Sequence, residues 1–477
     1  MKIITRMIKS HHKEIPESDI LETKTKTFRL TQFIVRVCQS PGWMVAVALF
    51  IRLVVAMSLL GDQFLPGQDN FSFGWETGRV ARSLAIGEGF SSPLPSLSPT
   101  GPTAWMTPVY VYIVAAVFKI FGVYTVESAV TLLALNALFS ALICLTVFFI
   151  ADKSFGRVIA IRAGWMWAMF PYSIEFGASR VWGDCFNALL FSALFMAALW
   201  LEDTESLKAP KAPKAYKAWM GFGLLAGLTT LACPPVLFVV LLWIAWIWRR
   251  NRRRGTSTGW SAALAMLMML LVVSPWFARN YRTFDCFIPF RSNFWLEMRV
   301  GNTGDTSDIL AGWAHPSINK AEMEEYRRLG ELNYMASKRR QTLDFIYANP
   351  GAFVSLTVRR FFCVWTGFWN IRLFYVEPLS TLYTIMNTIL TMFMLAGLFK
   401  AWRSDKAVAV PYLLALLSFP LVYYLTHPHA EYRHPIDTII VILVVYGAKG
   451  FFARIRAAAF NTAGERKKIF LSTVRGA

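Results

Sequence analysis

The amino-acid sequence predicts an all-α integral membrane protein, and three observations carry this prediction. Of the 477 residues, 55% are hydrophobic and only 16% are charged, whereas roughly 25% of a soluble domain is charged. Several apolar runs approach the ~20 residues that a helix needs to cross a bilayer. The net charge of +20 comes from basic residues in short blocks between these runs, as the positive-inside rule predicts. This distribution argues against a nucleic-acid-binding protein.

The apolar runs predict about ten transmembrane helices, with both termini in the cytoplasm. The polar, basic start of the chain has no cleavable signal sequence and indicates a cytoplasmic leader. The block RRNRRR after the sixth run fixes that end as cytoplasmic. The ten expected spans are Trp43–Leu60, Val126–Ile150, Ile159–Tyr172, Cys185–Leu201, Ala218–Cys233, Pro234–Trp248, Trp260–Trp276, Leu382–Trp402, Val408–Leu425 and Thr438–Phe452.

This topology divides the chain into five parts. They are a basic cytoplasmic leader (1–42), a transmembrane module (43–278) that includes the first outer loop (61–125), a long outer loop ending in an interfacial helix (279–379), a C-terminal group of transmembrane helices (380–452) and a basic cytoplasmic tail (453–477). The long loop is predicted to hold a helix at Ala321–Arg340 and an amphipathic helix at Phe353–Trp369. A connection of about seventy residues before the second of these indicates a function or a small subdomain.

The first outer loop is predicted to contain two interfacial helices. Over 73–84, apolar and polar side chains occupy adjoining sides of a helical wheel, with Phe73, Val80 and Leu84 on the first and Glu76, Arg79 and Ser83 on the second. A helix of this kind lies flat on a membrane surface. Pro108–Phe121 is apolar but has only about 14 residues, which is short for a span. Because the basic loop after the next run must be cytoplasmic, this segment is expected to be interfacial or re-entrant.

Two further features concern single residue types. Arg52 lies in the middle of the first span, where a charge needs a polar partner or a water-filled cavity, or else reaches an interface by snorkelling. The six cysteines show no metal-binding spacing and imply no cofactor.

Acids and arginines recur on the outer side of the expected topology. They are Asp69, Glu76, Arg79 and Arg82 in the first loop, Arg180 and Asp184 before the fourth span, the run RNYRTFDCFIPFRSNFWLEMRVGN, and the segment HPHAEYRHPID. A carboxylate can accept the proton of an acceptor hydroxyl, and an arginine can stabilise charge on a departing phosphate. Arg180 and Asp184 are also spaced for a simple ion pair. His427, His429 and His434 are candidate ligands for a divalent metal or ordinary interfacial residues.

From about Trp43 to Gly450 the chain resembles the GT-C class of membrane glycosyltransferases, near the protein mannosyltransferase and aminoarabinose transferase-like (glycosyltransferase 39-like) families. The resemblance is carried, in order, by GWETGRVARSLAIGEGF, TAWMTPVYVYIVAAVFKIFG, ASRVWGDCFNALL, PWFARNYRTFDCFIPFRSNF and EYRHPID. It implies an inverting transfer of a sugar from a polyprenyl-phosphate donor, outside the cytoplasm. Some members depend on a metal and others do not, so the cofactor stays open.

The resemblance also implies roles for individual residues. A first-loop carboxylate serves as the base or organises the site, and here Glu76 or Asp69 takes this role in the absence of an Asp-Glu pair. Asp184 becomes the second acid. The donor phosphate falls to basic residues, for which Arg79, Lys119, Arg180 and Arg433 are the candidates.

The sequence therefore predicts a polyprenyl-phosphate-dependent glycosyltransferase of a bacterial inner membrane with a periplasmic active site. The donor sugar and the acceptor, whether protein, lipid or glycan, are not specified. A lipid or lipid-linked-sugar flippase is the main alternative, because flippases are also polytopic, although their acids lie near the midplane. An inactive homologue is the other alternative.

Overall fold

The computed structural model describes residues 36–69, 71–96, 98–202, 213–254, 259–304, 309–367 and 380–450. It is 80% helical. Within these ranges no strand is present, and Ser91 and Pro102 form an isolated antiparallel bridge. The all-α prediction is confirmed. Most of the basic leader, the Lys- and Pro-rich segment at 203–212 and the basic tail lie outside the described residues.

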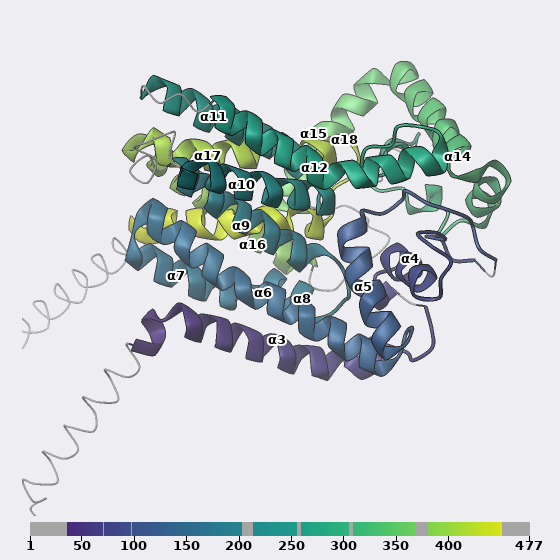
Figure 1. Ribbon diagram of the computed structural model, residues 1–477, viewed down its shortest axis with the longest axis horizontal. Coiled ribbons are helices and arrows are strands. Elements are labelled where there is room, and N and C mark those ends of the chain that lie inside the picture. Colours follow the sequence, from purple (N-terminus) through teal and green to yellow (C-terminus); the bar gives the residue numbers. More distant parts are fainter. Residues whose placement is uncertain are drawn as a thin grey trace, which may run out of the picture.

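The helices follow one another with short connections, apart from the two outer loops (Figure 1). They are α3 (Pro41–Gln63), η1 (Phe71–Phe73), α4 (Glu76–Ala85), α5 (Pro108–Phe121), α6 (Val126–Phe155), α7 (Arg157–Ala168), α8 (Pro171–Ala178), α9 (Asp184–Glu202), α10 (Pro213–Ala232), α11 (Val236–Arg253), α12 (Gly259–Phe284), α13 (Phe294–Gly301), η2 (Gly312–Ala314), α14 (Lys320–Ala348), α15 (Pro350–Thr366), α16 (Ser380–Ser404), α17 (Lys406–Ser418), α18 (Leu421–Leu425) and a last helix at 430–450.

Six helical segments among the described residues are long and apolar enough to cross a membrane. They are α3, α6, α9 as far as Leu201, α12, Thr381–Ser404 of α16, and Lys406–Leu425, which joins α17 and α18. The protein is therefore a multi-pass membrane protein. The other four expected spans coincide with α7 and α8, α10, α11 and the helix at 430–450, which are not among these six, so the count of about ten stays a prediction.

Proline and glycine explain two differences from the expected helix bounds. The predicted span Ile159–Tyr172 is broken, because α7 ends at Ala168 and α8 begins at Pro171, and the residue before a proline avoids the helical region. The expected helix in the long loop is two helices joined at Gly330, whose φ of 73° leaves the right-handed helical region. The bend folds the second half of α14 back, so that Lys338 reaches Glu325 of the first half at 3.0 Å.

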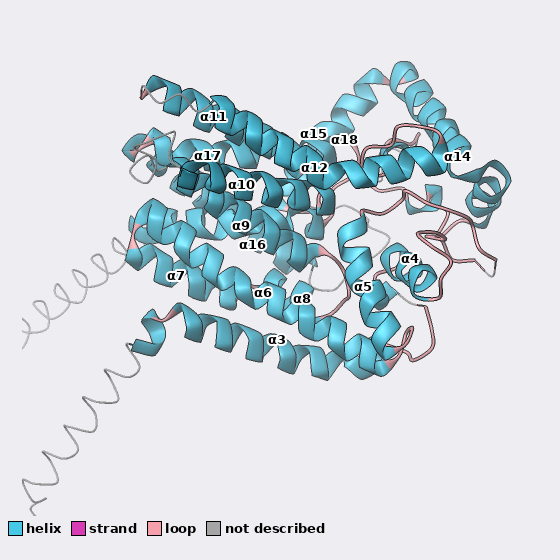
Figure 2. Ribbon diagram, viewed as in Figure 1, coloured by secondary structure: helices cyan, strands magenta, loops and turns pink. Residues whose placement is uncertain are grey.

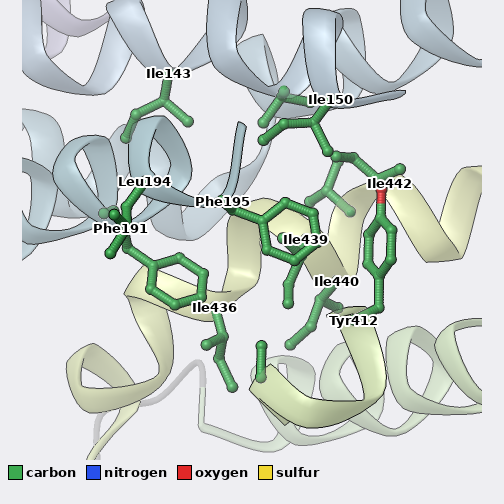
Figure 3. Packing of buried hydrophobic residues seen from close by; sticks show 14 of the residues in the cluster. Ile143, Ile150, Phe191, Leu194, Phe195, Tyr412, Ile436, Ile439, Ile440 and Ile442 are labelled. Carbon is green, nitrogen blue, oxygen red and sulfur yellow. The ribbon is translucent and has the colours of Figure 1, made fainter. Parts of the chain in front are cut away.

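The bundle core lies among α6, α9, α17 and the helix at 430–450. Figure 3 shows Ile143 and Ile150 of α6 facing aromatic rings of α9 and a row of isoleucines, with Phe191, Phe195, Ile436, Ile439 and Ile442 among the labelled side chains. Close packing of this kind holds membrane helices together because lipid offers no hydrophobic driving force between them. Small residues allow the closest approach: a Cβ on Gly397 of α16 would lie 2.0 Å from the Leu443 carbonyl oxygen.

Arg52 is fully buried in the bundle and has the polar partners that its mid-span position requires. Its guanidinium donates to Ser140 Oγ of α6 at 2.8 Å, to Ser173 Oγ of α8 at 2.7 Å, and to the carbonyl oxygens of Ala48, Trp167, Ala168 and Ser173. Arg52 therefore holds α3 against α6, α7 and α8 and does not reach an interface.

The outer-loop helices gather at one end of the bundle, where α5 runs across the bundle axis beside α4, with α14 on the same side (Figure 1). Much of the non-helical chain lies at this end as well (Figure 2). The apolar side of α4 does not meet lipid as expected: Val80 is fully buried, and Phe73 packs edge-on against Phe118 of α5, with ring centroids 6.0 Å apart. The polar side is covered too, because Arg79 and Ser83 are buried.

Candidate active site

Glu76 is the first residue of α4, and a tight turn fixes the position of this helix end. Gly74 has a φ of 88°, and a Cβ there would lie 2.4 Å from the carbonyl oxygen of Val181. The backbone N–H of Val181 donates to Ser72 at 2.8 Å. The turn therefore places the α4 N-terminus beside the segment that carries Arg180. A carboxylate at this end is favoured by the helix dipole.

The Glu76 side chain is 16% exposed and faces the long outer loop. Ser317 Oγ donates to Glu76 Oε1 at 3.4 Å, and His315 Nε2 lies 3.9 Å from the same oxygen. The first and the long outer loop thus meet at one of the two carboxylates that the resemblance offers as the base.

Asp69 and Arg79 pair with each other. Arg79 Nε donates to Asp69 Oδ2 at 2.6 Å, and Arg79 Nη1 donates to the carbonyl oxygen of Pro93 at 3.4 Å. This contact fixes the loop after α3 against α4. Of the two candidate bases, Asp69 is therefore paired with an arginine of its own loop, whereas Glu76 contacts Ser317 and His315 of the long loop.

Arg180 lies between α8 and α9 within a group of carboxylates. Its Nη2 is 3.8 Å from Glu175 Oε1 and 3.9 Å from Glu431 Oε2, distances longer than hydrogen bonds. Its guanidinium lies over the ring of Phe176 at 4.7 Å. Within the described chain its buried Nε has no hydrogen-bond partner. Arg180 therefore retains donors for an anion.

Two acids from distant parts of the chain adjoin Arg180. Asp184 begins α9, and its buried Oδ2 has no hydrogen-bond partner among the described residues. Glu431 Oε2 is hydrogen-bonded to His429 Nδ1. Burial raises the pKa of the Glu431 carboxyl, but His429 and Arg180 outweigh that effect and hold the pKa below its usual range. Glu431 therefore carries the negative charge that faces Arg180 and His429.

A further pair, Glu297 and His427, was not identified from the sequence. Glu297 of α13 lies 2.9 Å from His427 Nε2. Burial would raise the pKa of Glu297, but His427, Arg291 and His315 outweigh burial and lower this pKa to about 2. His315, which lowers the pKa of Glu297, also lies 3.9 Å from Glu76, so the pair and Glu76 have this histidine in common. Both residues lie in polar segments that the sequence predicts to be outer. Their contact could not be predicted because they are 130 positions apart in the chain.

A clamp formed by Arg360 of α15 positions this pair. Its guanidinium donates to the carbonyl oxygens of Tyr424 and Leu425 at the end of α18, and to that of Gly301 at the end of α13. A cation is favoured at helix C-termini. The clamp therefore fixes α13, which carries Glu297, against the segment that carries His427.

The carboxylate of Glu331 ties the two outer loops together. It accepts hydrogen bonds from Thr103 Oγ1, the backbone N–H of Ala104, Ser292 Oγ and Tyr326 Oη. Burial raises the pKa of Glu331. Because four donors from three segments converge on it, Glu331 holds the long loop in place over the first loop.

Two of the candidate phosphate-binding residues, Lys119 and Arg433, are not among the described residues that contact Glu76 or Arg180. Lys119 is exposed in the last turn of α5, away from the start of that helix, where Tyr110 contacts Asn136. Arg433 is buried, and its three nitrogens donate to Asp437 Oδ1 at 2.8 Å, to Asn387 Oδ1 at 2.6 Å and to the Val364 carbonyl oxygen at 3.1 Å. Arg433 thus binds together α15, α16 and the last helix.

The three histidines do not share one site. His427 and His429 pair with different glutamates, and His434 is fully buried against the ring of Trp167, with centroids 5.4 Å apart. Among the described residues no group of three or more His, Cys, Asp or Glu is placed to hold a metal ion. The three-histidine metal site is therefore not supported by the described part of the chain.

Comparison with solved structures finds this fold in an archaeal oligosaccharyltransferase, AglB from Archaeoglobus fulgidus. AglB in complex with an inhibitory peptide and a dolichol-phosphate matches with a TM-score of 0.52 at 16% identity, over 88% of this chain and 52% of AglB. The same enzyme tethered to an acceptor peptide matches with a TM-score of 0.52 at 14% identity, over 88% and 50%. The chain thus spans about half the length of AglB.

ArnT from Cupriavidus metallidurans, bound to undecaprenyl phosphate, matches with a TM-score of 0.36 at 14% identity, over 86% of this chain and 77% of ArnT. No family model and no curated protein matches the sequence. AglB is a glycosyltransferase of the GT-C class, so the resemblance to this class is confirmed at the level of the fold.

Proposed function

We propose that the protein is an inverting glycosyltransferase that moves a monosaccharide from a polyprenyl-phosphate donor to an acceptor hydroxyl. The observation that carries this proposal is the turn at Gly74, which sets the start of α4, where the half-buried Glu76 lies, beside the segment that holds Arg180, at one end of a fold shared with AglB. The dolichol-phosphate in the AglB complex supports a lipid-linked donor.

Glu76 is the proposed general base. Its carboxylate takes the proton of the acceptor hydroxyl, whose oxygen then attacks the anomeric carbon from the face opposite the phosphate. The bond between the anomeric carbon and the phosphate oxygen breaks, and its electron pair leaves with the polyprenyl phosphate. Attack from the opposite face inverts the anomeric configuration.

Arg180 is the proposed partner of the departing phosphate. Its unpartnered Nε and its long contacts to two carboxylates leave it donors that a phosphate oxygen can accept from. Glu175 of α8 and Glu431 of the last helix flank this guanidinium, and Asp184 is the proposed second acid of the pocket. Asp69 and Arg79, which are paired with each other, support the first loop in this scheme.

We also propose a bacterial inner membrane, a periplasmic active site and cytoplasmic termini. The basic blocks of the sequence support this orientation. The end that carries Glu76 and Arg180 is opposite to the end of α11, where the arginines of RRNRRR lie (Figure 1).

The experiment is a transfer assay on purified protein in lipid with radiolabelled polyprenyl-phosphate sugars, with and without EDTA. We expect Glu76→Gln to lower turnover roughly 10²- to 10⁴-fold, the usual worth of a general base, while donor binding is retained. Glu88→Gln is the matched control, because Glu88 is an exposed acid of the same loop, and it should turn over normally.

If Glu76→Gln is fully active and Asp69→Asn loses activity, Asp69 and not Glu76 is the base. Equal loss in Glu88→Gln would show that the assay reports folding of the loop and not the base. The EDTA arm decides metal dependence directly.

A further inference from the structure

A short segment of the long outer loop, 312–319, forms a rigid turn directly over Glu76. The backbone N–H of His315 donates to Gly312 at 3.0 Å, and the carbonyl oxygen of His315 accepts from Ile318 and Asn319, both at 3.0 Å. Asn319 also caps α14, with its side chain accepting from the backbone N–H of Ala321 at 2.9 Å. His315 is thus fixed by hydrogen bonds on both sides.

The imidazole of His315 has one nitrogen already in use. Its Nδ1 accepts from the backbone N–H of Ser317 at 3.2 Å. In the neutral ring the other nitrogen, Nε2, must then carry the proton. The ring also packs edge-on against Trp105, at 5.8 Å and 88°, which fixes its plane. The N–H that remains is the one at Nε2, and Nε2 is the nitrogen 3.9 Å from Glu76 Oε1.

Charged groups from three elements face this ring. Glu76 approaches from α4, and Glu297 approaches from α13, where it is paired with His427. Arg291 lies next to the same region, with its Nε donating to the Trp105 carbonyl oxygen at 2.8 Å. Of the two carboxylates that His315 influences, Glu297 already pairs with His427, so the free N–H of the ring can serve Glu76, which lies 3.9 Å from Nε2.

We propose that His315 is a positioning residue for Glu76: its Nε2–H, together with Ser317 Oγ, orients the Glu76 carboxylate so that one oxygen faces the acceptor hydroxyl. This inference rests on the proposed function, because it gives the long outer loop a role in aligning the proposed base. The contact closes from 3.9 Å to a hydrogen bond when the acceptor is bound, since catalytic hydrogen bonds often tighten only in the substrate complex.

The test compares two replacements of His315 in the full-length protein. His315→Gln keeps an N–H donor at about the place of Nε2, and His315→Leu removes it. We expect His315→Leu to lower kcat roughly tenfold to a hundredfold, the range for losing a hydrogen bond to a charged group, with the KM for the donor lipid unchanged. We expect His315→Gln to recover most of this loss. Asn333→Leu, an exposed polar residue of α14, is the control and should match the wild type.

A second measurement does not need turnover. Nitrogen NMR of protein labelled with ¹⁵N-histidine, with His315→Gln used to assign the signal, should show His315 protonated at Nε2 and not at Nδ1. The Nδ1-protonated form overturns the inference, and so does equal activity of His315→Leu and the wild type. If the wild type turns over no donor, the proposed function fails, whereas a normal wild type with an unaffected His315→Leu removes only the role of His315.

Discussion

Arg52, which is fully buried inside the bundle, and Arg180, which is 12% exposed beside the turn that precedes α4, differ in how many of their donors are used. Every nitrogen of the Arg52 guanidinium donates to a serine or a carbonyl oxygen of the surrounding helices. Arg180 approaches two carboxylates at 3.8 and 3.9 Å, and its Nε has no partner among the described residues. All guanidinium nitrogens of Arg52 are used in hydrogen bonds within the fold, whereas Arg180 retains a donor that a ligand could use.

The two arginines therefore differ in how many guanidinium nitrogens the fold occupies. A buried donor without a partner costs free energy. Arg360 also has a buried Nε without a partner, but its other two nitrogens bind carbonyl oxygens, whereas Arg180 makes only long contacts with carboxylates. By this criterion Arg433 belongs with Arg52, because Asp437, Asn387 and Val364 occupy its three nitrogens. The following substitutions test the comparison.

The largest effect is expected for Arg52→Met. It leaves Ser140, Ser173 and several carbonyl oxygens without their donor, and each buried group so left costs about 1–3 kcal/mol. We expect a loss of more than about 3 kcal/mol of stability, measured as thermal unfolding in detergent. Arg162→Met, at an exposed position of α7, should change stability by less than about 0.5 kcal/mol. Equal stability of the two variants would contradict a bracing role for Arg52.

An intermediate effect, on activity, is expected for Arg180→Lys. Lysine keeps the charge but loses the planar fork that matches a phosphate. We expect turnover of the donor lipid to fall roughly tenfold to a hundredfold, with little change in the unfolding temperature. Arg433→Lys should instead lower stability and activity together. If the two variants behave alike, the distinction between an arginine that retains a donor for a ligand and one whose nitrogens are all used fails.

The smallest effect is expected at low pH in His427→Leu. Since the pKa of Glu297 in the folded protein is lowered from 4.5 to about 2, its ionised form stabilises the fold above pH 4.5, and this contribution is lost as the pH falls toward about 2. Without His427 the pKa of Glu297 rises toward its ordinary value. The variant should therefore lose less stability between pH 4.5 and pH 2 than the wild type does, as measured by unfolding at several pH values. Parallel curves would contradict the pairing.

Much of the fold was predictable because helix ends carry local signals. The bounds of Pro108–Phe121 agree with α5 at both ends, since a proline begins the segment and a glycine with positive φ follows it. The predicted start of the second span agrees with α6, whose cap, Thr125, accepts from the backbone N–H of Ser128. The break between α7 and α8 at Pro171 was missed because the apolar run continues through it.

The candidate site was predictable only in part, because its contacts join segments far apart in the chain. The first-loop helix and Glu76 follow from a local pattern. The contact between Glu76 and Ser317 spans 241 positions, and no local pattern in one sequence gives such a pairing. Lys119 was a candidate for the phosphate by resemblance alone, and its exposed position on α5 could not be predicted because periodicity does not give the orientation of that helix. His315 is the single histidine of the long outer loop, which could have drawn attention to it. Its proximity to Glu76, however, was not predictable from the sequence.

The most direct measurement follows both the position of the donor lipid in the bilayer and the cleavage of its sugar–phosphate bond. Purified protein is reconstituted in liposomes with a labelled polyprenyl-phosphate sugar, and free polyprenyl phosphate and the position of the label across the bilayer are measured together. For wild-type protein we expect polyprenyl phosphate to be released with the sugar transferred, and we expect Glu76→Gln to stop this release. Movement of intact donor lipid across the bilayer without cleavage would contradict the glycosyltransferase and identify a flippase.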